Sequence, residues 1–122
     1  MKTTQGKAVA SFSALTKMAR RPMGSFAAFK LFRLRKALRD IVDFQTEQEQ
    51  KLLEELGGAF TDEGNAKFDT TEKADEFVKR HKELENMECE IETERIAMYM
   101  KEIPEISLAE MEILETFIDW KE

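Results

Sequence analysis

Residues 25–56 contain neither glycine nor proline, and this stretch constrains the fold more than any other feature of the chain. Pro22 and Gly24 precede it and Gly57-Gly58 follows it, which predicts one helix with Ser25 as its N-cap and a left-handed glycine at its end. At about 1.5 Å per residue the helix is roughly 48 Å long. A compact chain of 122 residues has a radius of gyration of only about 14 Å. We therefore expect an elongated shape or an oligomer.

Apolar side chains recur at spacings of three and four along one face of this predicted helix, with two glutamines among them: Leu31, Leu34, Leu38, Ile41, Gln45, Gln48, Leu52 and Leu56. Phe29, Phe32, Val42 and Leu53 widen the stripe. Such a face needs a cover, either a helix at residues 69–86 or a second copy of the chain. The glutamines either fix the register of that packing or lie in an exposed part of the helix, and exposure is the favoured interpretation.

The other segments predict shorter elements. Before the long helix they are an extended segment at residues 1–5 and a helix over 7–20. After it come a hairpin over 59–68, a helix from the capping pair Asp69/Glu72 to Asn86, and one or two strands within 87–100, for which a helix over 95–100 is the alternative. The last is a helix from the capping box Ser107/Glu110 to Leu114 or Phe117. We expect Ile118 and Trp120 to pack back on the body. The predicted class is α+β, mainly α: a long helical hairpin with a small β element and a short C-terminal helix, in a single domain over residues 1–122.

Charge is divided sharply along the chain. The basic helical segment 1–39 holds ten Lys and Arg and no acidic residue, whereas the acidic remainder 40–122 holds all 25 Asp and Glu with the other nine basic residues. This division bears on association rather than on fold. Three interpretations compete: the basic segment binds nucleic acid, it binds an acidic protein surface, or it lies against the acidic part of its own chain.

Seven basic residues are the candidate partner-binding residues: Arg20, Arg21, Lys30, Arg33, Arg35, Lys36 and Arg39. Phe26, Phe29 and Phe32 lie among them, and aromatic rings beside arginine serve both in base stacking and in protein hot spots. A spacing of three is nevertheless typical first of core positions. A solvated or internally paired face is the commonest role of such a basic helix, protein contact comes second, and nucleic acid comes last because the acidic remainder repels phosphate.

The residues that carry chemistry are sparse. The single histidine, His81, follows Lys79 and Arg80, and this basic setting disfavours metal binding and acid-base catalysis. The single cysteine, Cys89, lies among glutamates, which raise the pKa of a thiol. One cysteine makes no disulfide within the chain, so we expect a reducing cytoplasm. We expect no enzyme activity, no metal and no cofactor, and no apolar run is long enough to predict a membrane partner.

The order of these features resembles an uncharacterised family of small proteins from phages and prophages of Gram-positive bacteria. The resemblance covers most of the chain and rests on these segments: the Phe-Arg-Leu-Arg-Lys stretch from Phe32, Phe44, Glu47, Leu52 to Gly57, Asp62 to Asn65, Glu83 to Asn86, Glu88 to Ile91 and Ile106 to Glu115. It implies a phage origin and action inside a bacterial host cell. It transfers no catalytic or binding residue.

Together these features predict a non-enzymatic phage or prophage accessory protein that acts by protein–protein interaction and binds or inhibits a host or defence factor. A homodimer is compatible with this function. The alternative is a virion-assembly or tail-associated component that serves as a chaperone or spacer. An enzyme and a DNA-binding protein rank below both.

Overall fold

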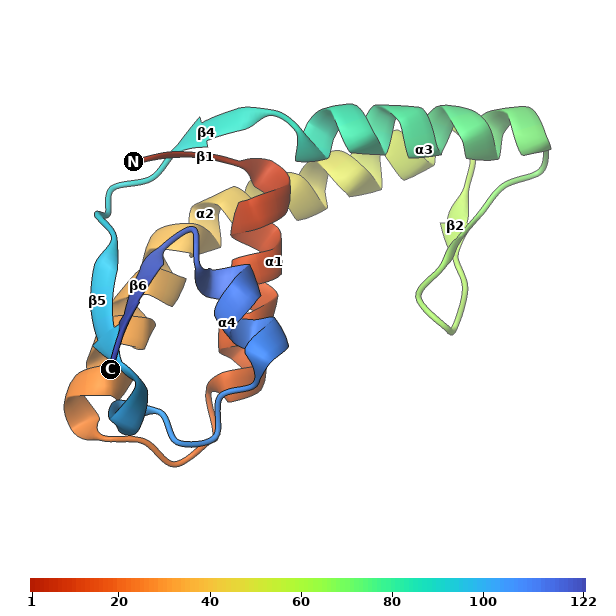
Figure 1. Ribbon diagram of the computed structural model, residues 1–122. Helices are drawn as coiled ribbons and strands as arrows, with labels where there is room; N and C mark the ends of the chain where they lie inside the picture. Colours follow the sequence, from red (N-terminus) through yellow and green to blue (C-terminus); the bar gives the residue numbers. More distant parts are fainter.

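The computed structural model describes residues 1–122 and shows a body from which a two-helix arm projects (Figure 1). The body contains α1 (Gln5–Met18), the first half of α2 (Ser25–Glu55) and α4 (Leu108–Leu114). The arm contains the second half of α2, α3 (Thr71–Glu85) and a hairpin of β2 (Ala59–Phe60) and β3 (Ala66–Lys67). The predicted α+β, mainly α class is confirmed. The long helix is confirmed as well, because α2 runs unbroken for 31 residues.

Two further pairs of short strands close the body. β1 (Lys2–Thr4) pairs antiparallel with β4 (Glu88–Glu90), so the N-terminus lies beside a segment that follows α3. β5 (Ile96–Tyr99) pairs parallel with β6 (Ile118–Lys121), and the 3-10 helix η1 (Met100–Glu102) follows β5. The prediction of two strands within 87–100 is confirmed. The alternative of a helix over 95–100 is wrong, and the segment predicted only to pack back forms strand β6.

Side-chain caps set where three of the helices begin. The Thr4 hydroxyl accepts from the backbone N–H of Lys7 at the start of α1. At α3 the cap is Thr70, which accepts from Lys73, so the predicted cap at Asp69 is wrong by one residue. The predicted capping box that opens α4 is confirmed, with reciprocal bonds at its two ends.

The ends of α2 depend on glycine. Gly24, and not the predicted Ser25, is the N-cap residue, and it supplies no side-chain hydrogen bond. At the other end Gly57 has φ +66°, the left-handed conformation that glycine adopts without strain and that ends the helix. The sequence therefore predicts both ends of α2 to within one residue of the observed ends.

The apolar stripe of α2 is buried against α1 and the C-terminal segment. One cluster of 14 buried residues forms the core. Its members on α2 are Ala27, Leu31, Leu34 and Leu38. They pack with Leu15 and Met18 of α1, Met98 of β5, Leu114 of α4, Ile118 of β6, and Phe117 between the last two elements. The cover over this half of the stripe is thus α1. The two predicted covers, a helix at residues 69–86 and a second copy of the chain, are not needed there.

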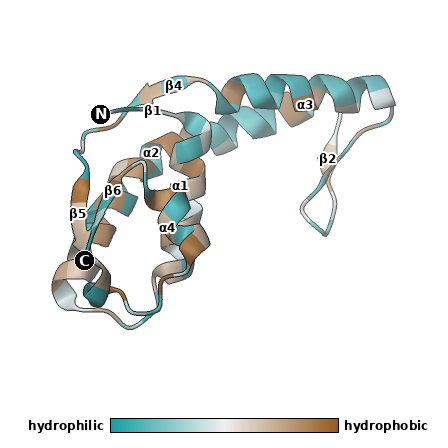
Figure 2. Cartoon of the chain, in the orientation of Figure 1, coloured by the Kyte–Doolittle hydropathy of each residue, from teal (hydrophilic) through white to brown (hydrophobic).

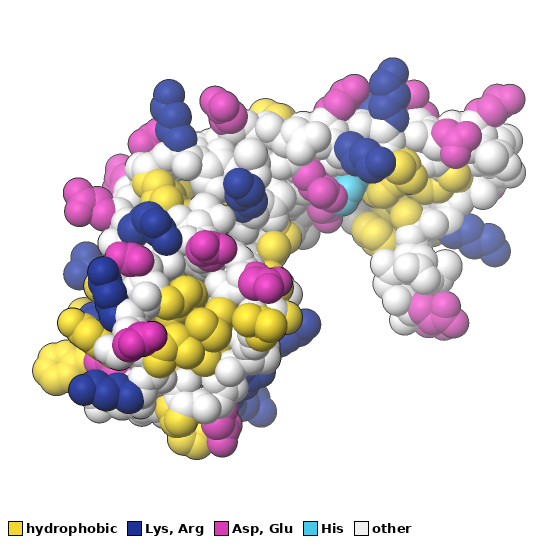
Figure 3. Space-filling model, viewed as in Figure 1, with side chains coloured by type: hydrophobic (Ala, Val, Ile, Leu, Met, Phe, Trp, Pro, Cys, Tyr) yellow, Lys and Arg dark blue, Asp and Glu magenta, His cyan; other side chains and the backbone are white.

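On the arm, α3 covers the rest of the stripe. Leu52, Leu53 and Gln45 of α2 are buried, whereas α3 itself has no buried residue. The favoured interpretation of Gln45 as exposed is therefore wrong. Hydropathy colouring shows a mainly hydrophilic arm (Figure 2), and both signs of charge cover α3 (Figure 3). The arm is held by a narrow contact of α3 with α2 and, at Glu85, with Gly6 of α1.

Polar contacts reinforce this narrow contact. The ring of His81 lies between two carboxylates, with Nε2 at 2.8 Å from Glu49 of α2 and Nδ1 at 2.7 Å from Glu85. The same ring stacks on Phe77 at a centroid distance of 5.6 Å. Arg80 pairs with Glu55 of α2 at 3.0 Å. The basic setting predicted for His81 from its neighbours in sequence is wrong, because consecutive residues of a helix point in different directions.

An ion pair ties the turn after α1 to α4. The Arg21 guanidinium contacts the Glu110 carboxylate and donates to the Glu105 carbonyl at 3.1 Å. Glu110 also accepts from the backbone N–H of Ser107. Hydrogen bonds from Arg21 first, and from Ser107, hold the pKa of the Glu110 carboxyl at about 2, below its ordinary value of 4.5.

Glu110→Gln should therefore destabilise the fold in a pH-dependent way. A depressed pKa contributes stability above the unfolded-state pKa, and this contribution is lost as pH falls from about 4.5 through about 2. At pH 7 we expect the variant to lose about 1–2 kcal/mol after solvent screening is considered. Urea unfolding at pH 7, 4 and 2.5 measures this difference. A gap between wild type and variant that stays constant across these pH values would contradict the assignment.

Candidate interaction surface

The face of α2 that points away from the core is exposed over the length of the helix. It consists of nine residues at alternating spacings of three and four: Phe26, Phe29, Arg33, Lys36, Asp40, Asp43, Glu47, Gln50 and Glu54. Every one of these residues is exposed, and so are the flanking residues Phe32 and Phe44. We call these nine positions the outer face of α2.

Three phenylalanines at the start of α2 lie in solvent. The exposed fractions are 81% for Phe26, 58% for Phe29 and 60% for Phe32. The prediction that their spacing makes them core residues is wrong. Each step of three residues rotates about 300° around a helix, and Phe29 lies about 200° from the buried Leu31. Burying a phenylalanine side chain is worth roughly 1.5–3 kcal/mol, and three rings left in solvent form an exposed apolar patch, a feature typical of interaction surfaces.

Two of the predicted basic residues share this surface with the rings. Arg33 and Lys36 are exposed on the outer face, and the Arg33 guanidinium carbon lies 5.9 Å from the centroid of Phe29. Apolar rings beside exposed cations combine hydrophobic contact with attraction for carboxylates. We call Phe26, Phe29, Phe32, Arg33 and Lys36 the aromatic–basic surface.

The other five predicted residues do not join this surface. Arg21 is engaged by Glu110, and Lys30 donates to the Ala97 carbonyl at 3.1 Å. Arg20 is exposed in the turn after α1. The remaining two lie over Phe12 of α1, at 5.0 Å for Arg35 and 5.5 Å for Arg39, and Arg35 also donates to Thr16. Part of the basic segment is therefore paired within the chain.

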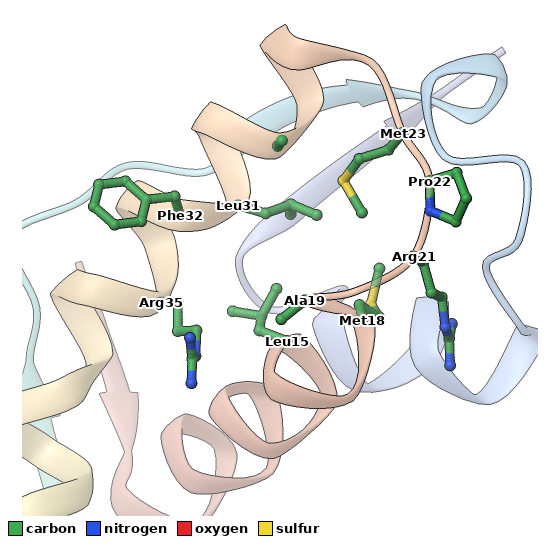
Figure 4. Close-up of a pocket in the computed structure, with 10 residues that line it drawn as sticks. Leu15, Met18, Ala19, Arg21, Pro22, Met23, Leu31, Phe32 and Arg35 are labelled. Carbon is green, nitrogen blue, oxygen red and sulfur yellow. The ribbon is translucent and has the colours of Figure 1, made fainter.

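An apolar pocket opens beside the aromatic–basic surface, where α1 ends and α2 begins (Figure 4). Its volume is about 430 Å³. Leu15, Met18, Met23 and Leu31 line it, and the Phe32 ring and Arg35 flank it (Figure 4). No sequence pattern described above predicts this pocket. The two methionines on either side of the Pro22 turn were the available signal, because flexible methionines are frequent at binding surfaces.

On its other side, the surface is bordered by carboxylates. Two neighbouring hollows, of about 700 Å³ and 450 Å³, separate α2 from the segment between β4 and β5. Phe29 and Arg33 line both, and so does Glu92, while Glu90 and Glu94 each line one. Asp40 continues the lining along α2. The cationic patch is therefore small and has negative charge at its edge.

Three further features bear on other kinds of function: the cysteine thiol, the side chains that bind metals, and the helices as membrane spans. Cys89 is half-buried in β4, and burial first and Glu90 second raise the pKa of its thiol, which lowers its reactivity. No group of three or more His, Cys, Asp and Glu side chains is arranged to hold a metal ion. None of the helices combines the length and the apolar character that crossing a bilayer requires.

Comparison with known proteins yields no relative: no family model, no curated protein and no solved structure matches the chain. The geometry described above is therefore the basis for a functional proposal.

The exposed rings should contribute little to folding. We expect Phe26→Ala and Phe29→Ala to change the free energy of unfolding by no more than about 0.5 kcal/mol. The matched control is Phe117→Ala, which removes a fully buried ring of the core and should cost about 3–5 kcal/mol. Urea unfolding measures all three variants. A loss above 2 kcal/mol in either exposed variant would show that the rings serve the fold rather than a partner.

Proposed function

We propose that this chain is a non-enzymatic accessory protein that acts by binding another protein through the aromatic–basic surface of α2. One observation carries the proposal: Phe26, Phe29 and Phe32 are more than half exposed on a helix whose opposite face is buried in this half at Leu31, Leu34 and Leu38. Aromatic residues and arginine dominate the binding energy of protein interfaces. The surface combines both within two turns of one rigid helix.

The chemistry of the surface favours a partner with apolar and acidic side chains. The pocket between α1 and α2 has room for an apolar side chain, and Arg35 at its edge offers a cation to a carboxylate beside that side chain. Arg33 and Lys36 offer two more cations about one turn away. An amphipathic acidic segment therefore matches the surface better than a neutral one.

The same geometry disfavours nucleic acid. A phosphate backbone would approach Glu90, Glu92 and Glu94 on one side of the cations and Asp40 on the helix itself. These carboxylates repel phosphate and offset the release of counterions that drives such binding. The exposed rings therefore support a protein partner.

The biological setting belongs to the same proposal. We propose, as the resemblance of the sequence pattern to small phage and prophage proteins implies, that the protein acts in the cytoplasm of a bacterial host. A host or defence factor is then the partner that the surface binds and inhibits.

Affinity capture tests this function. We expect the tagged wild-type protein to recover a stoichiometric partner from nuclease-treated bacterial lysate, and Phe29→Ser/Phe32→Ser to lose it. The control is Phe60→Ser/Val78→Ser, which replaces two similarly exposed apolar side chains on the arm. Recovery of the partner by all three proteins would show that the aromatic–basic surface does not bind it. Recovery that nuclease abolishes would instead indicate nucleic acid.

A second candidate function rests on the shape of the molecule. The α2–α3 arm projects from the body (Figure 1), and a projecting charged arm fits a spacer or chaperone in virion assembly or in a tail. Fractionation of infected cells distinguishes the two functions. Co-sedimentation with virions or tails favours assembly, whereas recovery in the host-protein fraction favours the accessory function.

A further inference from the structure

The outer face of α2 has the spacing of a second helix-packing seam. Alternation of three and four residues is the heptad pattern by which two helices pack along their length, and here it continues from Phe26 to Glu54. The inner stripe of α2 is already covered by α1 and α3. No helix of the chain packs on the outer seam, and the segment between β4 and β5 borders its first half only across the two hollows described above.

Charges along this seam change sign at its middle. Arg33 and Lys36 occupy consecutive seam positions in the first half, and Asp40 and Asp43 occupy the next two. None of these four side chains makes a salt bridge in the chain. In the opposite direction the series is two anions followed by two cations. Each charge of one series therefore faces an opposite charge when two copies of the seam run antiparallel.

We propose that the partner of this seam is a second copy of the chain, packed antiparallel along α2. An axis of twofold symmetry on the outer face, level with Leu38 along α2, places Lys36 opposite Asp40 of the second copy and Arg33 opposite its Asp43. Symmetry repeats both pairs, so four ion pairs cross the interface. This inference rests on the proposed function, because it assumes that the outer face of α2 binds protein. The second copy and a host factor then compete for Phe29, Arg33 and Lys36.

The same register places apolar side chains at the edges of the contact. Phe32 of one copy and Phe44 of the other lie at the same level on its two edges, and both rings are exposed in the single chain, at 60% and 40%. It also places Phe29 beside Glu47 of the second copy. The contact thus has an apolar part on each side of the charged centre, which stabilises the pairing.

The charges favour antiparallel packing over a parallel pair in register. A parallel pair in register would place Arg33 against Arg33 and Asp40 against Asp40, and like charges opposite one another destabilise an interface. A twofold arrangement also uses the same surface on both copies, so it closes at two chains. The apolar pocket between α1 and α2 lies beside this seam on the α1 side, so the dimer presents the pocket twice.

Charge reversal tests the proposal by sedimentation equilibrium of the purified chain. We expect wild type to be a dimer at low salt. Arg33→Glu/Lys36→Glu makes the whole seam acidic, and Asp40→Lys/Asp43→Lys makes its centre basic, so each variant alone should be monomeric, with affinity for itself lowered about tenfold or more. An equimolar mixture of the two should form a heterodimer, because every opposed pair is then restored.

Matched controls carry the same charge changes on the arm. Lys79→Glu/Lys82→Glu lies on α3 and Asp62→Lys/Glu63→Lys lies in the hairpin turn, and all four side chains are exposed. Both controls should remain dimeric. Raising the salt concentration from 50 to 500 mM should weaken the wild-type dimer, since it screens the four ion pairs.

Spin labels test the direction of packing. A nitroxide at Glu54→Cys in a Cys89→Ser background lies 16 residues from the axis, so antiparallel copies hold the two labels about 48 Å apart. Parallel copies would hold them within about 10–20 Å. A short distance, or a dimer that survives both charge reversals, would overturn the antiparallel α2 contact.

The failure of this inference is separable from failure of the proposed function. Wild type that remains monomeric at high concentration and low salt overturns the second copy as partner. If wild type then captures a partner protein that the Phe29→Ser/Phe32→Ser variant does not capture, the proposed function stands without the dimer. If wild type is monomeric and the variant captures the same proteins as wild type, both proposals are wrong.

Discussion

Burial of the apolar stripe of α2 against α1 is the contact on which the rest of the structure depends. Leu31, Leu34 and Leu38 meet the small and apolar residues of α1, and the C-terminal segment closes over both helices with Phe117 and Ile118. With about 1.5–3 kcal/mol for each buried large side chain, this cluster supplies most of the favourable burial in a short chain. Both the arm and the pocket take their positions from where α1 meets and leaves α2.

The arm illustrates what happens where that core ends. Beyond Leu38 only Ile41 of α2 still packs against the core cluster, and the rest of the helix is covered mainly by α3, which buries none of its own residues. Contacts of His81 with Glu49 and of Arg80 with Glu55 replace apolar packing there. Few buried apolar contacts correspond to a low free energy of local opening, so the arm is expected to open before the body. The molecule thus joins a well-packed body to a weakly held extension.

Sequence patterns predicted the parts of the fold that depend on local chemistry. Glycine and proline positions located α2, and Ser107 with Glu110 located α4. Pairing between β1 and β4 joins segments more than 80 residues apart, and no local pattern encodes such a partner. For the site, the sequence identified Arg33 and Lys36 but assigned the phenylalanines to the core, because a spacing of three fits a helix face only when alternated with four.

A rigid helix also explains why the division of charge along the chain remains unneutralised on α2. Arg21 reaches Glu110 because a turn brings the chain back onto α4, whereas Arg33 and Asp43 are held ten residues apart along one straight rod, about 15 Å by helical rise. No rearrangement of side chains closes that distance. Lys36 and Asp40 stand one turn apart, within reach of each other, but Arg33 cannot reach Asp43 on the same helix. A helix with the reversed order of charge is a surface that neutralises both of these residues at once.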